Sequence, residues 1–287
     1  MIDITGKGDY LNYLPSNKFI IDVDREVVLG NGTVKPYFAD SLLVPMIWEY
    51  PETDAFKGDL AIMDILATNG WKRPVYFSTT VPSSQYKGLD RFFIREGLAY
   101  RVAPVRTGTP APGEFGMTDP YVMYDNVINK FKWGNAEKPG VYLDENNRRM
   151  FSNYRSTFGE LALSLLAAGD TAKALEVTYK GLGLVPEDKM PYDYFALSLA
   201  DALIECGRKD EGKEIINRIL KYSGDYLGYC VAVPATERFG LEYTIGLNMQ
   251  TYIDIYRMSR RLGLDDIATP LEQELNRFYS LLYPSNR

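Results

Sequence analysis

The second half of the chain has apolar residues at the spacing of an α-helix. From Met150, apolar positions recur three and four residues apart until the break at 167–170, and a second stripe runs from Ala174 to Leu182. Asp144 stands where it could cap the start of the first stripe. The pattern predicts two antiparallel helices joined by a tight turn.

The same turn occurs twice more, at Gly207 and at Gly263, each time between two apolar helical stripes. The run Thr269-Pro-Leu-Glu272 has the form of a capping box with proline in the first turn, so the last helix is predicted to begin there. We therefore expect three helical hairpins, which is about the minimum for a stacked array.

The hairpins resemble tetratricopeptide repeats, which place glycine at the turn and alanine five residues later over a period of about 34 residues. Gly169 with Ala174 fits this pattern, and Gly263 with Ala268 repeats it. A small residue is needed there because the two helices of a hairpin approach most closely at that point. The second hairpin has Gly212 instead of alanine, and an insertion is expected around 223–237, so the repeats are degenerate.

The first half of the chain mixes strand and helix patterns and predicts an α+β fold overall. Residues 107–116 are rich in glycine and proline and predict a loop. The sequence Lys138-Pro-Gly140 interrupts the helical pattern and predicts a domain boundary. We expect a mixed α/β module at 1–140 and a helical repeat domain at 141–287. The predicted elements of the module are strands at 18–23, 26–29, 74–79 and 97–102, and helices at 59–68 and 121–132.

Composition excludes several classes of chemistry. The chain has no histidine, which removes Ser-His-Asp and Cys-His catalysis and every histidine-dependent zinc site. Cys206 and Cys230 are too few for a cysteine-only zinc site and are expected to be small buried hydrophobes. The net charge of −6 and the lack of a basic run argue against a nucleic-acid partner, and no apolar run could span a membrane. We expect no cofactor and no metal.

The junction Trp71-Lys72-Arg73 lies between the predicted helix at 59–68 and the strand that follows Pro74. A large aromatic beside two cations could anchor a sugar, an anion or a partner chain, or it could simply cover the edge of the core with its cations in solvent. Asp64 within the apolar helix is expected to need a partner, and Arg73 is the nearest candidate. Two roles are therefore considered for Asp64: a structural pair or cap, and a catalytic carboxylate.

The first helices of successive hairpins line a concave groove in repeat folds. Counting back from the turn glycines places six candidate binding residues in this groove: Tyr194, Asp201, Glu205, Gln250, Arg257 and Arg261. Mixed acidic and basic groups suit a peptide or a protein segment. The alternative is a groove filled by the chain's own N-terminal module.

Five segments together resemble one protein family. They are LNYLPSNKF (11–19), DLAIMDILATNGWKRPVYF (59–77), GLDRFFIREGLAYR (88–101), MYDNVINKFKWGN (123–135) and VYLDENNRRMFSNYR (141–155). The chain resembles the C-terminal extracytoplasmic region of large bacterial polytopic membrane proteins whose N-terminal part is similar to protein O-mannosyltransferases. The resemblance covers about the first 190 residues.

The resemblance implies a domain on the periplasmic side, tethered to the inner membrane by parts of the protein that precede it, and explains why no signal peptide is visible. It also implies that sugar transfer would use acidic residues of the membrane part, so no catalytic residue is carried over to this chain. The leading hypothesis is a non-catalytic accessory domain that binds an acceptor protein, partner subunits or its own membrane region. The alternatives are a carbohydrate-binding module that uses aromatic platforms such as Trp71, and a stand-alone hydrolase.

Overall fold

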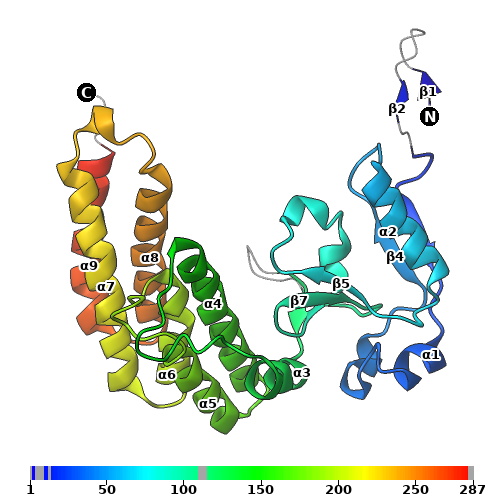
Figure 1. Ribbon diagram of the computed structural model, residues 1–287, viewed down its shortest axis with the longest axis horizontal. Coiled ribbons are helices and arrows are strands. Elements are labelled where there is room, and N and C mark those ends of the chain that lie inside the picture. The colour runs from blue at the N-terminus through cyan, green and yellow to red at the C-terminus, as the bar shows by residue number, and fades with distance from the viewer. Residues whose placement is uncertain (1, 4–9, 12–13, 109–114, 284–287) are drawn as a thin grey trace. The chain divides into compact units, whose positions relative to one another are not determined.

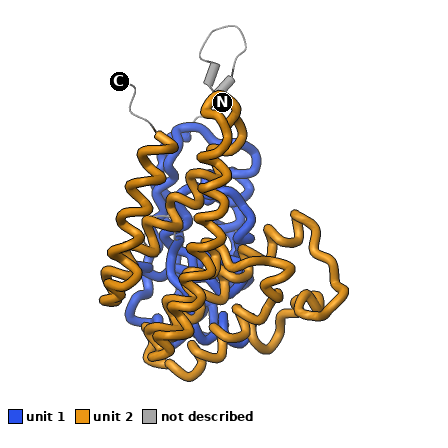
Figure 2. The backbone as a smooth tube through the Cα atoms, turned by 90° about the vertical axis from the view of Figure 1, so that its left-hand side faces the viewer, with its two compact units in different colours: residues 1–126 blue, residues 127–287 orange. Residues whose placement is uncertain are grey.

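The computed structural model describes residues 2–3, 10–11, 14–108 and 115–283 (Figure 1). The chain divides into two compact units, Met1–Asn126 and Val127–Arg287, which Figure 2 shows in two colours. All the described strands lie in the first unit and the long helices lie in the second, so the predicted α+β class is confirmed. The sequence placed the boundary after Gly140, whereas residues 127–140 cluster with the helical unit. Their Trp133 ring packs against Tyr154 and Phe158, at centroid distances of 5.1 and 5.2 Å.

The strands of the first unit form three small sheets. Side chains of the second sheet alternate between a buried and an exposed face, as expected for a half-buried sheet. Met46 and Trp48 are buried, whereas Ile20 and Ile47 pair across the two strands on the exposed face. The third sheet has the order β5-β7-β6-β8, in which only the β6–β8 pair is parallel. The strands are β1 Ile2–Asp3 with β2 Tyr10–Leu11, β3 Lys18–Ile21 with β4 Met46–Glu49, and β5 Val75–Ser78, β6 Phe93–Arg95, β7 Ala99–Val102 and β8 Met117–Thr118.

The helices of the first unit are short. The predicted strand at 26–29 is wrong, because α1 spans Arg25–Gly30 there: the Asp24 carboxylate accepts hydrogen bonds from the backbone nitrogens of Glu26 and Val27 and starts a helix. The other elements are α2 Lys57–Thr68, α3 Pro120–Tyr124, which continues into a π-helix at Asp125–Lys130, and 3-10 turns at Pro36–Ser41, Ser83–Gln85 and Leu89–Phe92. Residues 109–114 of the predicted loop lie outside the described residues.

Helix α2 lies against the core with one face and leaves the other in solvent. Leu66 and Asp59 are its buried residues, and Leu60 and Ile65 are nearly half exposed. Asp64 is on the exposed face, so the prediction that it needs a partner such as Arg73 is wrong. The many apolar residues of this helix predict that core surrounds it on most sides. In the structure, its apolar residues continue onto the face that is open to solvent.

The second unit is built from three helical hairpins, as predicted. The turn glycines Gly169, Gly207 and Gly263 have φ of +82°, +80° and +65°, which glycine adopts without strain. Asp144 caps the first helix by accepting a hydrogen bond from the Asn147 nitrogen at 2.8 Å, as predicted. The hairpins are α4 Glu145–Ala167 with α5 Thr171–Leu182, α6 Leu197–Glu205 with α7 Lys209–Ala232, and α8 Glu242–Arg261 with α9 Asp265–Leu282. Short 3-10 turns lie at Tyr194–Ala196 and Ala235–Glu237.

Two details of the hairpins differ from expectation. Helix α9 begins at Asp265, before the capping box at Thr269, and Pro270 lies inside it. The earlier start follows from packing: Ile267 and Ala268 are buried, and the Ala268 nitrogen already donates to the Leu264 carbonyl. The insertion expected at 223–237 is taken up largely by α7, which continues to Ala232 and ends before Pro234.

The small residues that follow each turn are buried where the helices of a hairpin meet. Ala174 and Ala268 are fully buried. At Gly212 an added Cβ would lie 2.4 Å from Ile204 Cγ1 and 2.9 Å from the Ala200 carbonyl oxygen. Helices α6 and α7 therefore pack too closely for alanine, which explains why the second hairpin departs from the repeat pattern.

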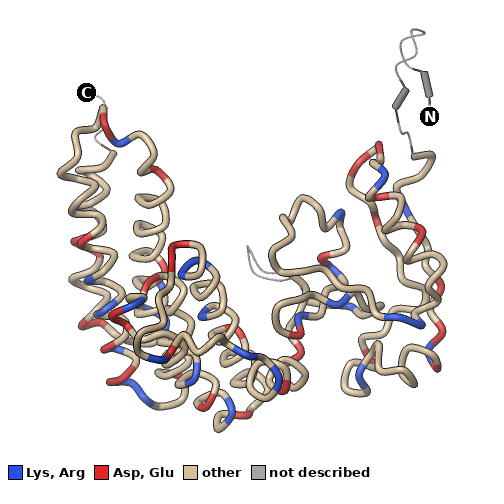
Figure 3. The backbone as a smooth tube through the Cα atoms, in the orientation of Figure 1, with Lys and Arg blue, Asp and Glu red and all other residues tan. Residues whose placement is uncertain are grey.

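The remaining features of the helical unit concern its surface and its thiols. Cys230 is buried, Cys206 is half-buried at the end of α6, and both are free thiols. Figure 3 shows acidic and basic residues interspersed along both units. Among the described residues, no helix is both long enough and apolar enough to cross a membrane.

Candidate functional site

The face formed by α6 and α8 brings together the candidate residues that the repeat pattern predicted. Asp201 and Glu205 lie one turn apart on α6, and Arg261 reaches both from the last turn of α8. Its Nη2 lies 2.6 Å from Asp201 Oδ2 and its Nη1 lies 2.7 Å from Glu205 Oε1. One guanidinium therefore bridges the first helices of the second and third hairpins, which places these residues on a common surface. We call this surface the inner face.

Asp254 is the centre of a second group on the inner face, and sequence reasoning missed it. The Gln250 amide donates to Asp254 Oδ1 at 2.9 Å, and Arg257 Nη1 lies 3.5 Å from the same oxygen. Burial, together with the negative charge of the nearby Asp254 carboxylate, raises the pKa of Tyr194. The spacing held a usable signal, because Asp254 is four residues after Gln250 and three before Arg257, on one side of a helix.

The inner face is polar and remains partly open to solvent. The side chains of Arg257 and Arg261 are 71% and 52% exposed, whereas that of Asp201 is 15% exposed. Burial raises the pKa of Asp201, and the adjacent Arg261 opposes that effect. Acidic groups thus lie deeper than the basic groups, which can turn outward toward a bound chain.

Next to the inner face is a small pocket that we call the tyrosine pocket. Its volume is about 180 Å³. Tyr194 belongs to both features, because the Asp254 charge acts on it and it also lines the pocket. The pocket is lined by Asp193, Tyr194, Tyr222, Tyr226, Thr244, Leu247 and Asn248.

The Trp71 tip of the first unit is built as a corner. Trp71 is buried, and its indole nitrogen donates to the Asp22 carbonyl at 2.8 Å. The Trp71 backbone has a φ of +59°. Its carbonyl accepts a hydrogen bond from the side-chain amide of Asn31 at 2.8 Å. These contacts tie the end of α2 to the segment around α1. The ring face that would stack on a sugar is covered.

Lys72 and Arg73 are exposed on the same corner. They line an open hollow of about 500 Å³ with Ile65, Asn69 and Pro74. The Arg73 backbone is fixed, because Asn69 Oδ1 accepts from its nitrogen at 3.1 Å and the Asn69 amide donates to its carbonyl at 2.6 Å. The two cations are therefore accessible and set on a rigid turn; they belong to the first unit, whereas the inner-face residues belong to the second.

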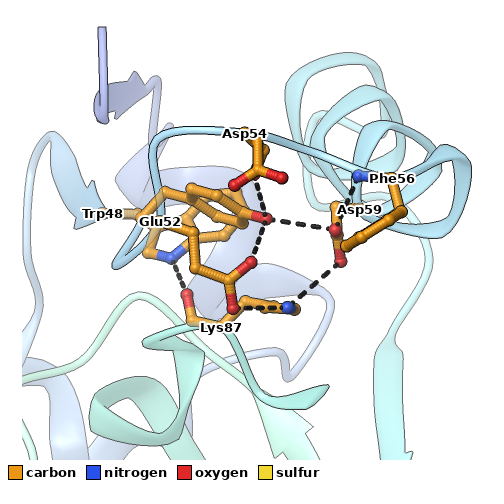
Figure 4. Close-up of polar contacts among 7 residues, drawn as sticks. Trp48, Glu52, Asp54, Phe56, Asp59 and Lys87 are labelled. Atoms are coloured by element: carbon orange, nitrogen blue, oxygen red, sulfur yellow. Dashed lines mark hydrogen bonds and ion pairs between the residues drawn. The ribbon is translucent and has the colours of Figure 1, made fainter. Parts of the chain in front are cut away.

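A buried cluster of charged groups lies where α2 begins (Figure 4). Lys87 Nζ is 2.7 Å from Glu52 Oε1 and 4.0 Å from Asp59 Oδ1. The Asp59 carboxylate also accepts from the Phe56 nitrogen at 2.9 Å, so it holds the first turn of α2. The Tyr50 hydroxyl lies 3.1 Å from the same carboxylate. The sequence did not reveal this cluster, since its members come from separate segments.

The chemistry of the Lys87 cluster is that of a structural clamp. The hydrogen bond with Glu52 is the main cause that raises the pKa of Lys87 above its ordinary value, so the side chain stays an ammonium ion. A nucleophilic or basic lysine needs the opposite shift. Burial, followed by the hydrogen bond to Asp59, likewise raises the pKa of Tyr50. The Trp48 indole donates to the Lys87 carbonyl at 2.8 Å and completes the link between β4 and this segment.

A larger hollow in the second unit is lined by aromatic and polar groups. Its volume is about 550 Å³, and Phe131, Trp133, Lys132 and Lys180 are among the residues that line it. The Phe131 and Trp133 rings meet edge to face at 5.7 Å.

Among the described residues, no cluster of three or more Asp, Glu or Cys side chains is arranged to hold a metal ion.

Comparison with known proteins gives one match, to part of the chain. Residues 2–121 match the family described as TMEM260-associated domain 2. The matched range lies within the first unit and covers less than half of the chain. No curated protein and no solved structure matches the chain. The match agrees with the coarse expectation of a domain from a membrane-protein family, while the bacterial source and the tetratricopeptide character stay predictions.

Proposed function

We propose that this chain is a non-catalytic accessory domain of a membrane glycosyltransferase-like protein, and that its tetratricopeptide-like hairpins bind a segment of an acceptor protein or of a partner subunit on the periplasmic side of the inner membrane. The match of residues 2–121 to a TMEM260-associated domain supports the link to a membrane-protein family. The observation that carries the binding role is the inner face, where ordered acidic groups lie beside two partly exposed arginines.

The geometry of the inner face suits an extended polypeptide. The Arg261 guanidinium spans Asp201 and Glu205, and Gln250 and Arg257 both contact Asp254. Backbone carbonyls and side chains of a bound segment can replace the solvent around the exposed guanidinium groups with little rearrangement of the acids behind them. Preorganised groups of this kind lower the cost of ordering on binding.

The test is capture of peptides by the whole chain. An array of peptides from extracytoplasmic proteins should contain sequences that bind the wild-type chain and lose binding in Arg257→Ala. Lys221→Ala is the matched control, because Lys221 is an exposed cation on α7 and is not part of the inner face. Equal binding by wild type and Arg257→Ala would refute the inner face as the binding surface. Sugar transfer or glycan hydrolysis by the chain itself, abolished by one point mutation, would refute the non-catalytic role.

A carbohydrate-binding role is the second candidate, and the hollow at Trp133 favours it. Its volume lies in the range of small-ligand sites, and it combines two aromatic rings with lysine side chains. Titration with a panel of glycans should detect binding that Trp133→Ala removes and Tyr142→Ala, at an 82% exposed position outside the hollow, leaves intact. Glycan binding that survives Trp133→Ala would exclude this hollow.

A further inference from the structure

The tyrosine pocket is too small for a cofactor and is the right size for one side chain. Ligand pockets for small molecules typically span about 300–1,000 Å³. The tyrosine pocket holds about 180 Å³ and opens beside the inner face through the shared residue Tyr194. A segment lying on the inner face would thus have one side chain within reach of this pocket.

The walls of the pocket are aromatic. Tyr222 and Tyr226 lie one turn apart on α7, with ring centroids 5.4 Å apart and planes inclined by 58°. Tyr194, which also lines the pocket, lies on the 3-10 turn before α6, with its ring edge to face against Phe195 at 5.6 Å. The faces of such rings carry negative potential and attract a cation within about 6 Å. Tyr226 is 42% exposed, so the pocket can be entered from solvent.

A carboxylate lies among these rings. Asp193 Oδ1 accepts from the Phe195 nitrogen at 3.1 Å, and Asp193 Oδ2 lies 3.4 Å from the Ser152 hydroxyl. Burial is the main influence on this group and raises the pKa of Asp193, while the charge of Arg155 and the hydrogen bonds from Phe195 and Ser152 act in the opposite direction. An incoming cation in the pocket would add a further favourable charge beside this carboxylate.

The charge of Arg155 acts on Asp193, but the hydrogen bonds of its guanidinium go to backbone carbonyls. The Arg155 guanidinium is fully buried and donates to the carbonyls of Pro191 at 2.6 Å and Met190 at 2.7 Å. It lies over the Tyr192 ring, 5.0 Å from the centroid. Arg155 therefore does not line the tyrosine pocket, and the pocket itself presents one carboxylate and three phenol rings.

We propose that the tyrosine pocket binds the side chain of an arginine in the protein segment that lies on the inner face. This inference rests on the proposed function and gives the partner a defined chemistry. A guanidinium group is planar, stacks on aromatic faces and pairs with a carboxylate, so it satisfies both features of the pocket at once. A neutral side chain of the same shape could lie against the rings but would add no positive charge beside the Asp193 carboxylate.

The first experiment tests the pocket alone. N-acetyl-L-arginine amide and its neutral isostere N-acetyl-L-citrulline amide are titrated into the whole chain by ligand-detected NMR. The arginine compound should bind about tenfold more tightly, as expected for one cation–π contact with a partly desolvated carboxylate. Tyr226→Ala and Asp193→Asn should bring the two affinities within twofold. Tyr229→Ala, at an exposed tyrosine on the same helix that does not line the pocket, should keep the preference.

Asp193→Asn retains an oxygen that can cap the 3-10 turn, so loss of selectivity in this variant reports the charge. Circular dichroism confirms that each variant is folded. Equal affinity for the arginine and citrulline compounds in the wild-type chain would overturn the proposal. A tenfold preference that persists in Tyr226→Ala would overturn it as well, because the cation would then bind elsewhere.

The second experiment separates this inference from the proposed function. Two pools of random decapeptides, one with arginine and one with citrulline fixed at the centre, are tested by fluorescence anisotropy. If both pools bind equally and Arg257→Ala weakens both, the inner face binds peptides and the arginine pocket is refuted. If the arginine amide binds selectively but neither pool binds, the pocket stands and the peptide-binding function is refuted.

Discussion

Two glycine-to-alanine substitutions on one helix should shift stability in opposite directions. Gly212 and Gly228 both lie within α7. At Gly228 an added Cβ meets nothing within 4 Å, whereas at Gly212 it would lie 2.4 Å from Ile204 Cγ1 and 2.9 Å from a backbone oxygen. The chemical change is identical, so the difference between the two variants isolates the packing of α6 against α7.

The magnitudes follow from two opposing effects. Alanine in a helix interior is favoured over glycine by about 0.5–1 kcal/mol, and this gain applies at both positions. Overpacking a tight contact costs about 1–3 kcal/mol, and this cost applies only at Gly212, where a backbone carbonyl cannot move away as a side chain can. Gly228→Ala should therefore be about 0.5–1 kcal/mol more stable than wild type, and Gly212→Ala about 1–2 kcal/mol less stable.

The assay is urea unfolding followed by far-ultraviolet circular dichroism, which reports mainly the helices of the second unit. The midpoints should move in opposite directions at an unchanged slope. If Gly212→Ala is as stable as Gly228→Ala, the helices can separate without cost, and the close approach of α6 and α7 does not explain the glycine.

Three further predictions concern charged groups. Lys87→Met should destabilise the first unit by about 2 kcal/mol in urea unfolding followed by tryptophan fluorescence, to which Trp48 and Trp71 of this unit contribute, because it leaves the buried Asp59 without its counter-charge; an unchanged midpoint would contradict the clamp. Affinity for the arginine amide should fall on acidification at a higher pH than for a surface aspartate. The reason is that burial raises the pKa of Asp193 against the opposing charge of Arg155 and beside Tyr222, so the carboxylate is neutralised early; Asp193→Asn should abolish this pH step in the NMR titration. The pair Arg261 and Asp201 should couple by less than about 1 kcal/mol in a double-mutant cycle of Arg261→Met and Asp201→Asn, since the arginine side chain is 52% exposed, and a coupling above about 2 kcal/mol would show that the bridge is structural.

The helical hairpins could be predicted because their signals are local. An apolar stripe, a turn glycine with positive φ and a second stripe lie within a few tens of residues, and packing requires no distant partner to define them. The error at 26–29 has a local cause too. Val27, Val28 and Leu29 favour a strand by propensity, but the Asp24 cap decides for a helix.

The inner face could be predicted from the sequence, whereas the Lys87 cluster could not. The grouping of Asp201, Glu205 and Arg261 followed from repeat geometry, because equivalent positions of successive hairpins must lie on one face. The Lys87 cluster joins Glu52 and Asp59 to Lys87, which lies in a separate segment just before the 3-10 turn at Leu89–Phe92, and no spacing rule connects them. The prediction for Asp64 fails because the buried acid of α2 is Asp59, which lies five residues earlier on another side of the helix.

The pair of free thiols makes this protein easy to label at a chosen point. Cys206 is half-buried at the end of α6, next to Glu205 of the inner face, whereas Cys230 is 1% exposed. Burial raises the pKa of both thiols, so a maleimide dye or a nitroxide will react slowly, and in mildly alkaline solution it will attach first at Cys206. An optical or paramagnetic reporter can thus be placed beside the inner face of the wild-type chain without removing any other residue.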